Sequence, residues 1–364
     1  MAEPLHIAVD GRELAGAPTG VGRYLTEVLR AWLRAGADER LSVVVPAEPV
    51  QPFADPAGRL SWILEAASTA GTRWEQVRLR RAVNRLSPDV LFAVGYTAPL
   101  LVRCPTVLVI HDVSFAAHPE WFAGREGVRR RWLTRACARR AAAVVTVSEF
   151  SKQEIVRWLH TPADRIVLAP PGVPDQPERG QTARRQPIAL FVGSLFNRRR
   201  IPDLIAGFAV AARRVPDARL VLVGDNRTSP RQDPLAIARN LGVADRVEYH
   251  AWIDDERLSA CYASARVFAF LSDYEGFGMT PFEAIAHGVP SVVLDTPHSR
   301  DVYGAGARLV APDPASVGDA LATLLTDDEA HGVLLAAGRR QLARYSWDRT
   351  AAVLMDTLRQ VARR

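Results

Sequence analysis

The sequence alternates short apolar runs with longer helical patterns, and this alternation limits the chain to a few folds. Between the first two runs, apolar residues recur at helical spacing from Val21 to Trp32. Strands that alternate with helices predict a parallel sheet covered on both faces, because a parallel connection has to cross over the sheet. The runs of this kind in the first half of the chain are residues 6–10, 41–46, 89–95, 106–112 and 143–148.

The alternation stops at residues 170–187, PPGVPDQPERGQTARRQP, whose Pro, Gly, Gln and Arg content is typical of a linker. It then restarts, with strand-like runs at residues 188–194, 219–225, 246–253, 265–272 and 291–295. We therefore expect an α/β protein of two doubly wound, Rossmann-like domains that face each other across a ligand-binding cleft. The expected divisions are a first domain at 1–174, a linker at 175–187, a second domain at 188–344, and a helix at 345–364 that packs back on the first domain.

The composition is that of an ordinary globular protein. The 364 residues are 48% hydrophobic and 24% charged, and no apolar run approaches the roughly 20 residues of a membrane span. The N-terminus shows no secretory signal pattern, and Cys104, Cys137 and Cys261 form no CxxC pair. These features predict a cytoplasmic protein without a disulfide framework or a structural zinc site.

Two carboxylates flank a glycine-rich loop in the stretch DYEGFGMTPFEAIAHGVP, residues 273–290. One interpretation is helix capping, with Thr280 as N-cap, Pro281 as the first helical residue, and Glu283 reaching back to a backbone amide. This leaves Glu275 and its neighbouring glycines without a role. The other interpretation is a ligand site, because glycines allow close approach of the backbone and a helix N-terminus attracts anions. The local sequence does not decide between the two.

Loops after the predicted strands are the other candidate sites, because ligands of such sheets bind beyond the carboxyl ends of the strands. After the first strand, Gly16, Gly20 and Gly22 with Arg23 form a flexible loop that can admit phosphate oxygens. No GxGxxG follows a strand, and the chain has no P-loop, GxSxG or HExxH motif. The usual dinucleotide, ATPase, serine-hydrolase and zinc-protease readings therefore lose support.

The segment EGFGMTPFEA, followed by AHGVP, resembles the E-x7-E element of the retaining nucleotide-sugar glycosyltransferases of the GT-B fold, known as family 4 or group 1. This motif is strongly specific. Weaker supporting segments occur in the expected order and extend the resemblance over nearly the whole chain. They are PTGVGRY (18–24), VIHDVSF (109–115), VTVSEFS (145–151), FVGSLFNRRR (191–200), LVLVGD (220–225) and YSWDRT (345–350).

In the second domain, the resemblance implies a donor site. Glu283 would accept hydrogen bonds from the ribose hydroxyls, and Glu275 would contact hydroxyls of the donor sugar. Arg198 and Arg199 would clamp the diphosphate and neutralise the leaving group, although relatives usually have Lys at the second position. The alternative for the arginines is an exposed run of charge. Backbone amides would also touch the donor, from Phe277, Gly278 and Met279.

In the first domain, the resemblance implies that Gly20, Val21 and Gly22 form a loop that closes on the diphosphate. His111 would lie close to the donor sugar and support either the developing positive charge or the acceptor. The alternative for His111 is a structural histidine at the end of a strand.

The implied reaction is retaining transfer of a hexose from a nucleoside-diphosphate sugar to an acceptor hydroxyl, with GDP-mannose as the favoured donor and a glycan or glycolipid as acceptor. Two arginines and a helix N-terminus would stabilise the leaving group, so no cofactor and no metal is expected. Asp254 and Asp255 precede a helix and are expected to begin it rather than bind metal. The alternatives are a sugar-nucleotide epimerase or hydrolase of the same fold, an inverting transferase, and a non-catalytic two-domain binding protein.

Two segments concentrate positive charge in a chain of net charge +6. Residues 125–140 hold seven Arg and one Glu, and residues 73–85 hold five Arg and one Glu. They are either solvated helix faces or a surface for anionic lipid at the inner face of a membrane, with Trp74 and Trp132 as anchors. Nucleic acid is not expected, because no helix-turn-helix, zinc-finger or RNP pattern accompanies the charge.

Overall fold

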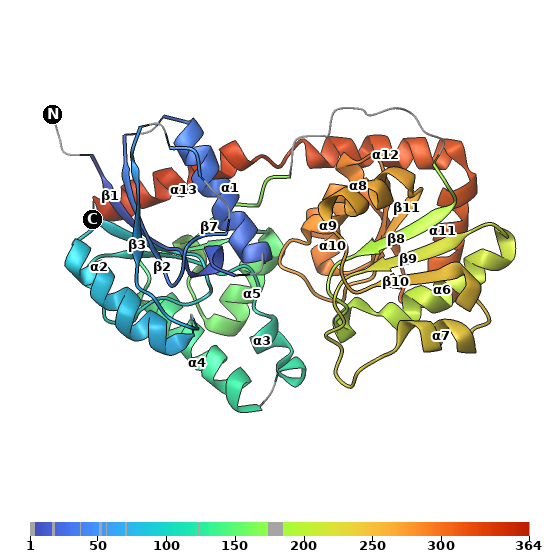
Figure 1. Ribbon diagram of the computed structural model, residues 1–364, viewed down its shortest axis with the longest axis horizontal. Coiled ribbons are helices and arrows are strands. Elements are labelled where there is room, and N and C mark those ends of the chain that lie inside the picture. The colour runs from blue at the N-terminus through green and yellow to red at the C-terminus, as the bar shows by residue number, and fades with distance from the viewer. Residues whose placement is uncertain are drawn as a thin grey trace. The chain divides into compact units, whose positions relative to one another are not determined.

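The computed structural model contains two compact units (Figure 1). The first comprises Met1–Gly172 together with Ser346–Arg364, and the second comprises Val173–Tyr345. Most of the linker expected at 175–187 lies outside the described residues, which resume at Arg185. The residues that the structure describes are 4–16, 19–36, 38–50, 53–55, 57–69, 71–122, 124–173 and 185–363.

The first unit is built on a sheet of seven parallel strands in the order β3-β2-β1-β4-β5-β6-β7. The strand β1 buries every residue of its sequence HIAVD, as a strand covered on both faces requires. The strands are β1 (His6–Asp10), β2 (Arg40–Val45), β3 (Leu60–Leu64), β4 (Val90–Ala93), β5 (Thr106–Val109), β6 (Ala143–Thr146) and β7 (Ile166–Leu168).

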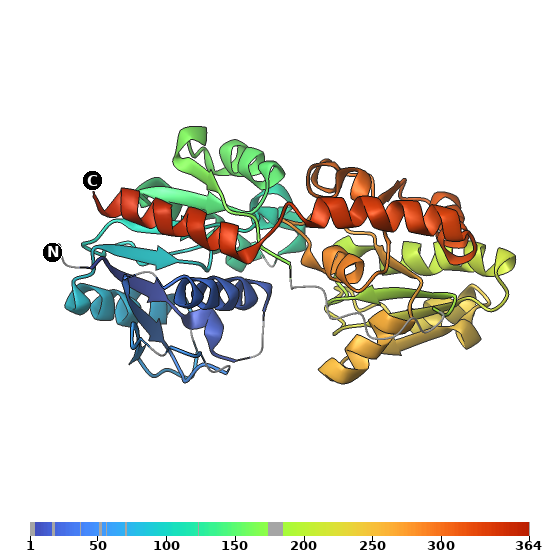
Figure 2. The same cartoon turned by 90° about the horizontal axis from the view of Figure 1, so that it is seen from above.

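Helices cover both faces of this sheet. On one face, α2 (Arg80–Leu86), α4 (Gly124–Arg140) and α5 (Glu149–Leu159) share a buried cluster with Leu91 of β4. Phe92 points to the opposite face, where its ring lies 5.4 Å from that of Trp32 in α1 (Gly20–Arg34). The last helix, α13 (Trp347–Ala362), lies beside α1 (Figure 2), and Trp32 Nε1 donates a hydrogen bond to the Ala351 carbonyl at 2.8 Å.

The second unit is built on a sheet of six parallel strands in the order β10-β9-β8-β11-β12-β13. Its strands are β8 (Ile188–Val192), β9 (Arg219–Val223), β10 (Val247–His250), β11 (Val267–Phe270), β12 (Ser291–Leu294) and β13 (Arg308–Val310). Its helices are α6 (Ile201–Arg214), α7 (Pro234–Asn240), α8 (Asp255–Ser264), α9 (Met279–Ala286), α10 (Pro297–Val302), α11 (Pro314–Thr326) and α12 (Asp328–Leu342). In the described parts of both units, no helix has the length and apolar character needed to cross a bilayer.

Three strands that the sequence pattern does not predict all lie at sheet edges. They are β3, β7 and β13; β3 is partly exposed along its whole length, and the other two have three residues each. An edge strand pairs on one side only, so it can be short and less apolar. Its periodicity is correspondingly weak in the sequence.

We predict that Gly172→Ala destabilises the first unit, because a Cβ at this position would overlap the backbone nitrogen of Trp347 at the start of α13. Overpacking of this kind costs about 1–3 kcal/mol, so the urea midpoint followed by circular dichroism should fall. Gly332→Ala is the control: a Cβ there meets nothing within 4 Å, and an alanine in the middle of α12 should stabilise by about 0.5–1 kcal/mol. An unchanged midpoint for Gly172→Ala would contradict the packing of α13 described above.

Candidate functional site

Arg199 and Glu275 form a partly buried ion pair beyond the carboxyl ends of β8 and β11 in the second unit. Arg199 ends the short 3-10 helix η5 (Asn197–Arg199), and its Nε donates to Glu275 Oε1 at 3.2 Å. Its Nη1 donates to the Ser194 carbonyl at 2.8 Å. Gly193 has a φ of +139°, and a Cβ there would lie 2.5 Å from Arg199 Nη1. A glycine at 193 therefore leaves the space that the guanidinium occupies.

Arg198 lies beside the same carboxylate but is less completely paired. Its Nε is 3.8 Å from Glu275 Oε1, and its guanidinium stacks over the Phe196 ring at 4.5 Å. The Nε atom is buried and has no hydrogen-bond partner among the described residues. The Arg198 and Arg199 side chains are only 21% and 14% exposed, so they are not a solvated run of charge. Arg198 thus has donor capacity left for a ligand.

Glu275 is held as a carboxylate. Burial alone would raise the pKa of Glu275, but the charges of Arg199 and Arg198 and a hydrogen bond from Ser272 outweigh this effect and lower the pKa. The Ser272 hydroxyl donates to Glu275 Oε1 at 3.0 Å. An ionised, hydrogen-bonded carboxylate between two cations is a strong acceptor for sugar hydroxyls.

The loop after Glu275 leads into α9, which begins two residues earlier than the sequence predicts. Gly278 is its N-cap, in the left-handed region at a φ of +72°, and no side-chain hydrogen bond caps the helix. The capping interpretation with Thr280 as N-cap is therefore wrong. Glu283 is the fifth residue of α9, too far along for a capping box, because the left-handed Gly278 lets the helix begin at Met279. The first amides of α9 carry no side-chain cap among the described residues, and amides at a helix N-terminus favour anions.

Two residues that the sequence analysis did not select hold this loop in place. His298 Nε2 donates to the Phe277 carbonyl at 3.0 Å, and the Tyr303 hydroxyl donates to the Gly278 carbonyl at 2.8 Å. A Cβ on Gly278 would overlap the Tyr303 hydroxyl. Both residues follow β12, in the segment PHSRDVYG. Their position after a strand end is the signal that could have identified them.

In the first unit, the predicted loop residues Gly20, Val21 and Gly22 form the first turn of α1 instead. Thr19 is the N-cap, and its hydroxyl accepts a hydrogen bond from the Gly22 amide at 2.9 Å. A Cβ on Gly22 would overlap the Glu13 carbonyl, so this glycine serves the packing of α1. Its amide is paired in this way, whereas among the described residues no side chain accepts a hydrogen bond from the amides of Gly20 and Val21.

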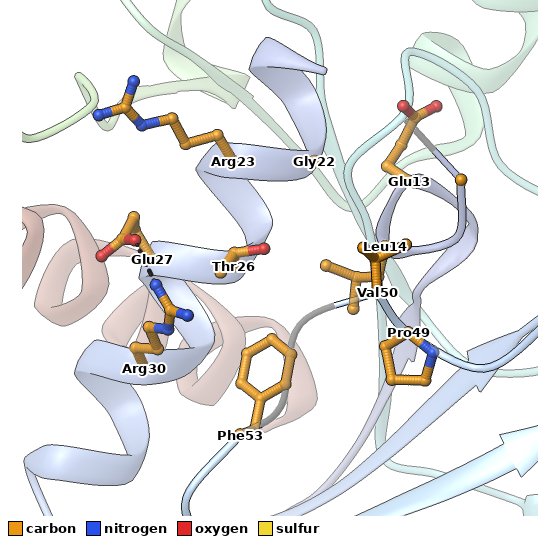
Figure 3. A pocket seen from close by; sticks show the side chains of 11 residues that line it. Glu13, Leu14, Gly22, Arg23, Thr26, Glu27, Arg30, Pro49, Val50 and Phe53 are labelled. Carbon is orange, nitrogen blue, oxygen red and sulfur yellow. Dashed lines mark hydrogen bonds and ion pairs between the residues drawn. The ribbon is translucent and has the colours of Figure 1, made fainter. Parts of the chain in front are cut away.

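A hollow of about 170 Å³ lies beside this turn (Figure 3). Leu14, Val50 and Phe53 supply apolar walls, and the Thr26 side chain points across it toward Leu14 and Val50. Glu13 lies at its edge. Apolar walls with a few polar groups are the usual lining of a small-molecule pocket.

His111 follows β5 at the carboxyl end of the first unit's sheet. Burial lowers the pKa of His111 to about 4, against a raising effect of Asp112, so the ring is neutral at pH 7. Its Nε2 lies 3.2 Å from the Val94 carbonyl, which can only accept, so Nε2 carries the proton. In the described part of the chain Nδ1 has no partner. The ring also packs edge-on against Tyr24, at 5.1 Å between centroids.

No group of three His, Cys, Asp or Glu side chains among the described residues is placed to hold a metal ion. Asp254 has the helix-start role expected for it: it is the N-cap of α8, and its Oδ1 accepts from the Arg257 amide at 2.8 Å.

Comparison with known proteins places this chain among enzymes. The family described as glycosyl transferases group 1 matches residues 173–341, and glycosyltransferase family 4 matches residues 18–176. O-antigen chain mannosyltransferase B of Escherichia coli is 28% identical over 363 residues, 91% of this chain and 93% of that protein. D-inositol 3-phosphate glycosyltransferase of Xylanimonas cellulosilytica is 32% identical over 243 residues, 61% of this chain and only 58% of that protein.

Solved structures support the same fold. Anabaena HepE in complex with UDP and glucose has a TM-score of 0.74 at 18% identity, covering 98% of this chain and 100% of that one. WaaG, a glycosyltransferase involved in lipopolysaccharide biosynthesis, has a TM-score of 0.73 at 16% identity, covering 97% and 99%. With the family matches on both halves of the sequence, the chain belongs to the family 4, or group 1, glycosyltransferases of the GT-B fold.

Proposed function

We propose that this chain transfers a hexose, with mannose favoured, from a nucleoside-diphosphate sugar to an acceptor hydroxyl with retention at the anomeric carbon. The observation that carries the proposal is the ionised Glu275 between Arg198 and Arg199, next to the uncapped N-terminus of α9. This arrangement offers an acceptor for sugar hydroxyls and donors for a diphosphate within one small region.

In the proposed reaction, the bond between the anomeric carbon and the diphosphate oxygen breaks, and its electron pair leaves with the nucleoside diphosphate. The acceptor oxygen bonds to the same face of the anomeric carbon, and its proton passes to the departing diphosphate. Arg198, Arg199 and the first amides of α9 stabilise the charge that develops on the leaving group. Because these groups are cationic or oriented dipoles, we propose that no metal is required.

Two further groups complete the proposal. Glu283 is partly exposed on α9, and its carboxylate accepts hydrogen bonds from the ribose hydroxyls of the donor. His111 is neutral, and its Nδ1 accepts a hydrogen bond from a hydroxyl of the donor sugar or acceptor. A neutral ring with a free lone pair also tolerates the positive charge that develops at the anomeric carbon better than an imidazolium would.

GDP-mannose is the favoured donor because several relatives carry mannose in their names. Besides the Escherichia coli protein, a GDP-mannose-dependent alpha-(1-6)-phosphatidylinositol monomannoside mannosyltransferase of Mycobacterium tuberculosis is 28% identical over 314 residues, 78% of this chain and 79% of that protein. A glycan or glycolipid acceptor fits the same relatives. Family membership argues against the non-catalytic binding protein considered from the sequence.

The test is a panel of nucleotide sugars, with release of nucleoside diphosphate measured with and without acceptor extracts and in EDTA. Acceptor-dependent release from GDP-mannose that survives EDTA is expected, and NMR of the anomeric proton in the product should show retention. Release without acceptor would indicate a hydrolase or epimerase. If EDTA abolishes the release of nucleoside diphosphate and magnesium restores it, the proposal that no metal is required is wrong.

We predict that Glu283→Ala weakens donor binding roughly 10- to 100-fold, because charge-assisted hydrogen bonds are lost. Calorimetric titration with GDP-mannose measures this. Asp254→Ala is the matched control: it removes an actual N-cap, so it should lower the melting temperature and leave donor affinity intact. If Glu283→Ala binds donor normally, the ribose role is wrong.

We expect Arg198→Ala and Arg199→Ala each to lower kcat about 10²- to 10³-fold, because each removes a cation that stabilises the leaving group. Arg199→Lys should retain much of the activity, since the charge remains. Arg214→Ala is the control, because this arginine is exposed at the end of α6 and pairs with Asp319 at 2.5 Å. If both alanine variants turn over at the wild-type rate, the two arginines do not stabilise the leaving group.

One of the two tryptophans predicted as membrane anchors is buried. Trp74 is only 3% exposed, and its Nε1 donates to the Glu65 carbonyl at 2.7 Å, so its proposed role as an anchor is wrong. Trp132 is 65% exposed and Val128 56%. The arginines that share their exposed face of α4 are Arg125, Arg129, Arg135 and Arg139. We propose that this face of α4 contacts anionic lipid, with Trp132 inserted.

We predict that the protein cosediments with phosphatidylglycerol vesicles at low salt, more than with phosphatidylcholine vesicles, and that salt weakens the binding. Trp132→Ala should reduce the fraction of vesicle binding that persists at high salt. Trp252→Ala is the control, because Trp252 is 80% exposed in the second unit and should have no effect. Equal binding to both vesicle types would leave the arginines as a solvated face.

A further inference from the structure

A groove of about 650 Å³ in the first unit is lined by four arginines that the proposed donor site does not use. It runs between the segment after β3 and the π-helix η2 (Trp74–Leu79) with α2. Among the described residues that line it, Glu65 is the only acidic one. The arginines of the lining are Arg73, Arg78, Arg81 and Arg85.

Three of these arginines are uncompensated. Arg85 pairs with Glu65 at 2.7 Å. Within the described residues, Arg73, Arg78 and Arg81 make no ion pair and no hydrogen bond. The groove therefore holds an excess of three positive charges. Guanidinium groups match the oxygens of phosphate in pairs, and several of them converging on one hollow are typical of phosphate recognition.

The π-helical turn explains how these side chains come to share a face. Its characteristic bond joins the Arg80 amide to the Glu75 carbonyl, five residues back. In a regular α-helix Arg73 and Arg78 would point about 140° apart. The wider turn brings the directions of residues five apart closer to each other, and Arg73 and Arg78 both border the groove, followed by Arg81. Turns of this kind occur frequently at functional sites.

The opposite side of the same turn is fixed to the sheet. Glu75 is buried and forms an ion pair with Arg12, which also pairs with Asp10 at the end of β1. The Thr97 hydroxyl donates to Glu75 at 2.5 Å, and Gln76 Nε2 donates to the Ala98 carbonyl at 3.1 Å. The arginine face is therefore carried on a turn anchored beyond β1 and β4, which reduces the cost of ordering it around a ligand.

We propose that this groove binds a phosphate or diphosphate group, held by Arg73, Arg78 and Arg81. We further assign that group to the acceptor, and this second step rests on the proposed function. The groove lies beyond the carboxyl end of β3, at the same edge of the sheet as His111 after β5. A phosphorylated acceptor anchored there would present its sugar along the edge that carries His111.

The test is calorimetric titration of the full chain with inorganic pyrophosphate at low ionic strength. The triple variant R73Q/R78Q/R81Q should lose at least about tenfold in affinity for one pyrophosphate. The control R125Q/R135Q/R139Q removes the same charge from α4 and should change affinity less than about twofold. Because the three groove arginines are exposed, circular dichroism should show that the variant is folded; Arg78→Gln alone should give a smaller loss in the same direction. Equal losses in groove and control variants would overturn the site.

A second arm separates the sources of the phosphate. Vesicles of phosphatidylcholine with phosphatidic acid are offered to the groove variant and to R214Q/R219Q/R239Q, which removes the same charge from exposed positions of the second unit. A loss of vesicle binding in the groove variant alone indicates a lipid phosphate, and unchanged vesicle binding with lost pyrophosphate binding indicates a water-soluble one. R198Q/R199Q removes the donor clamp. If R198Q/R199Q loses pyrophosphate binding and the groove variant does not, the groove is not a phosphate site. If the groove variant loses pyrophosphate binding but the wild-type protein transfers no sugar, only the proposed function is refuted.

Discussion

Parallel strand pairing is the constraint on which the rest of each unit depends. Every strand pair in both sheets is parallel, so every connection crosses a face of its sheet and all carboxyl ends meet at one edge. In the second unit this edge brings together Gly193 after β8, Glu275 after β11 and His298 after β12, which lie far apart in the sequence. In the first unit the same edge carries Arg12 after β1 and His111 after β5.

The group at Glu275 shows how the second unit keeps a charge partly buried. Removing a carboxylate from water is costly unless it is paired and hydrogen-bonded. Arg199, Arg198 and Ser272 meet that need, and the stacking of both guanidinium groups on aromatic rings holds them at the site. The protein's own side chains hold this cluster together, and such preorganisation is what the proposed stabilisation of a leaving group needs.

The first unit uses charge differently. Asp10, Arg12 and Glu75 form a buried ion group that fixes η2 to the loops of the sheet. The outward face of the same turn carries arginines that have no ion pair within the described part of the chain. One turn thus combines a rigid inner side with a positive outer side. The contact between Arg129 of α4 and Thr72 makes the basic faces of α4 and of the segment around η2 neighbours, so a lipid surface and a phosphate group would meet adjacent parts of this unit.

The repeated strand and helix periodicity predicted the two α/β sheets and ten of their strands, because a buried strand must be apolar along its whole length. The edge strands β3, β7 and β13 do not have to be apolar along their whole length, and the periodicity did not predict them. The motif around Glu275 identified the candidate site, since its glycines and acids are adjacent in the chain. The sequence could not show that Gly278 rather than Thr280 begins α9, that His298 and Tyr303 hold the loop, or that Trp74 is buried. It also could not show that a π turn aligns Arg73 with Arg78. Each of these depends on which distant segment fills the space beside a residue, and only the packing of the tertiary structure decides that.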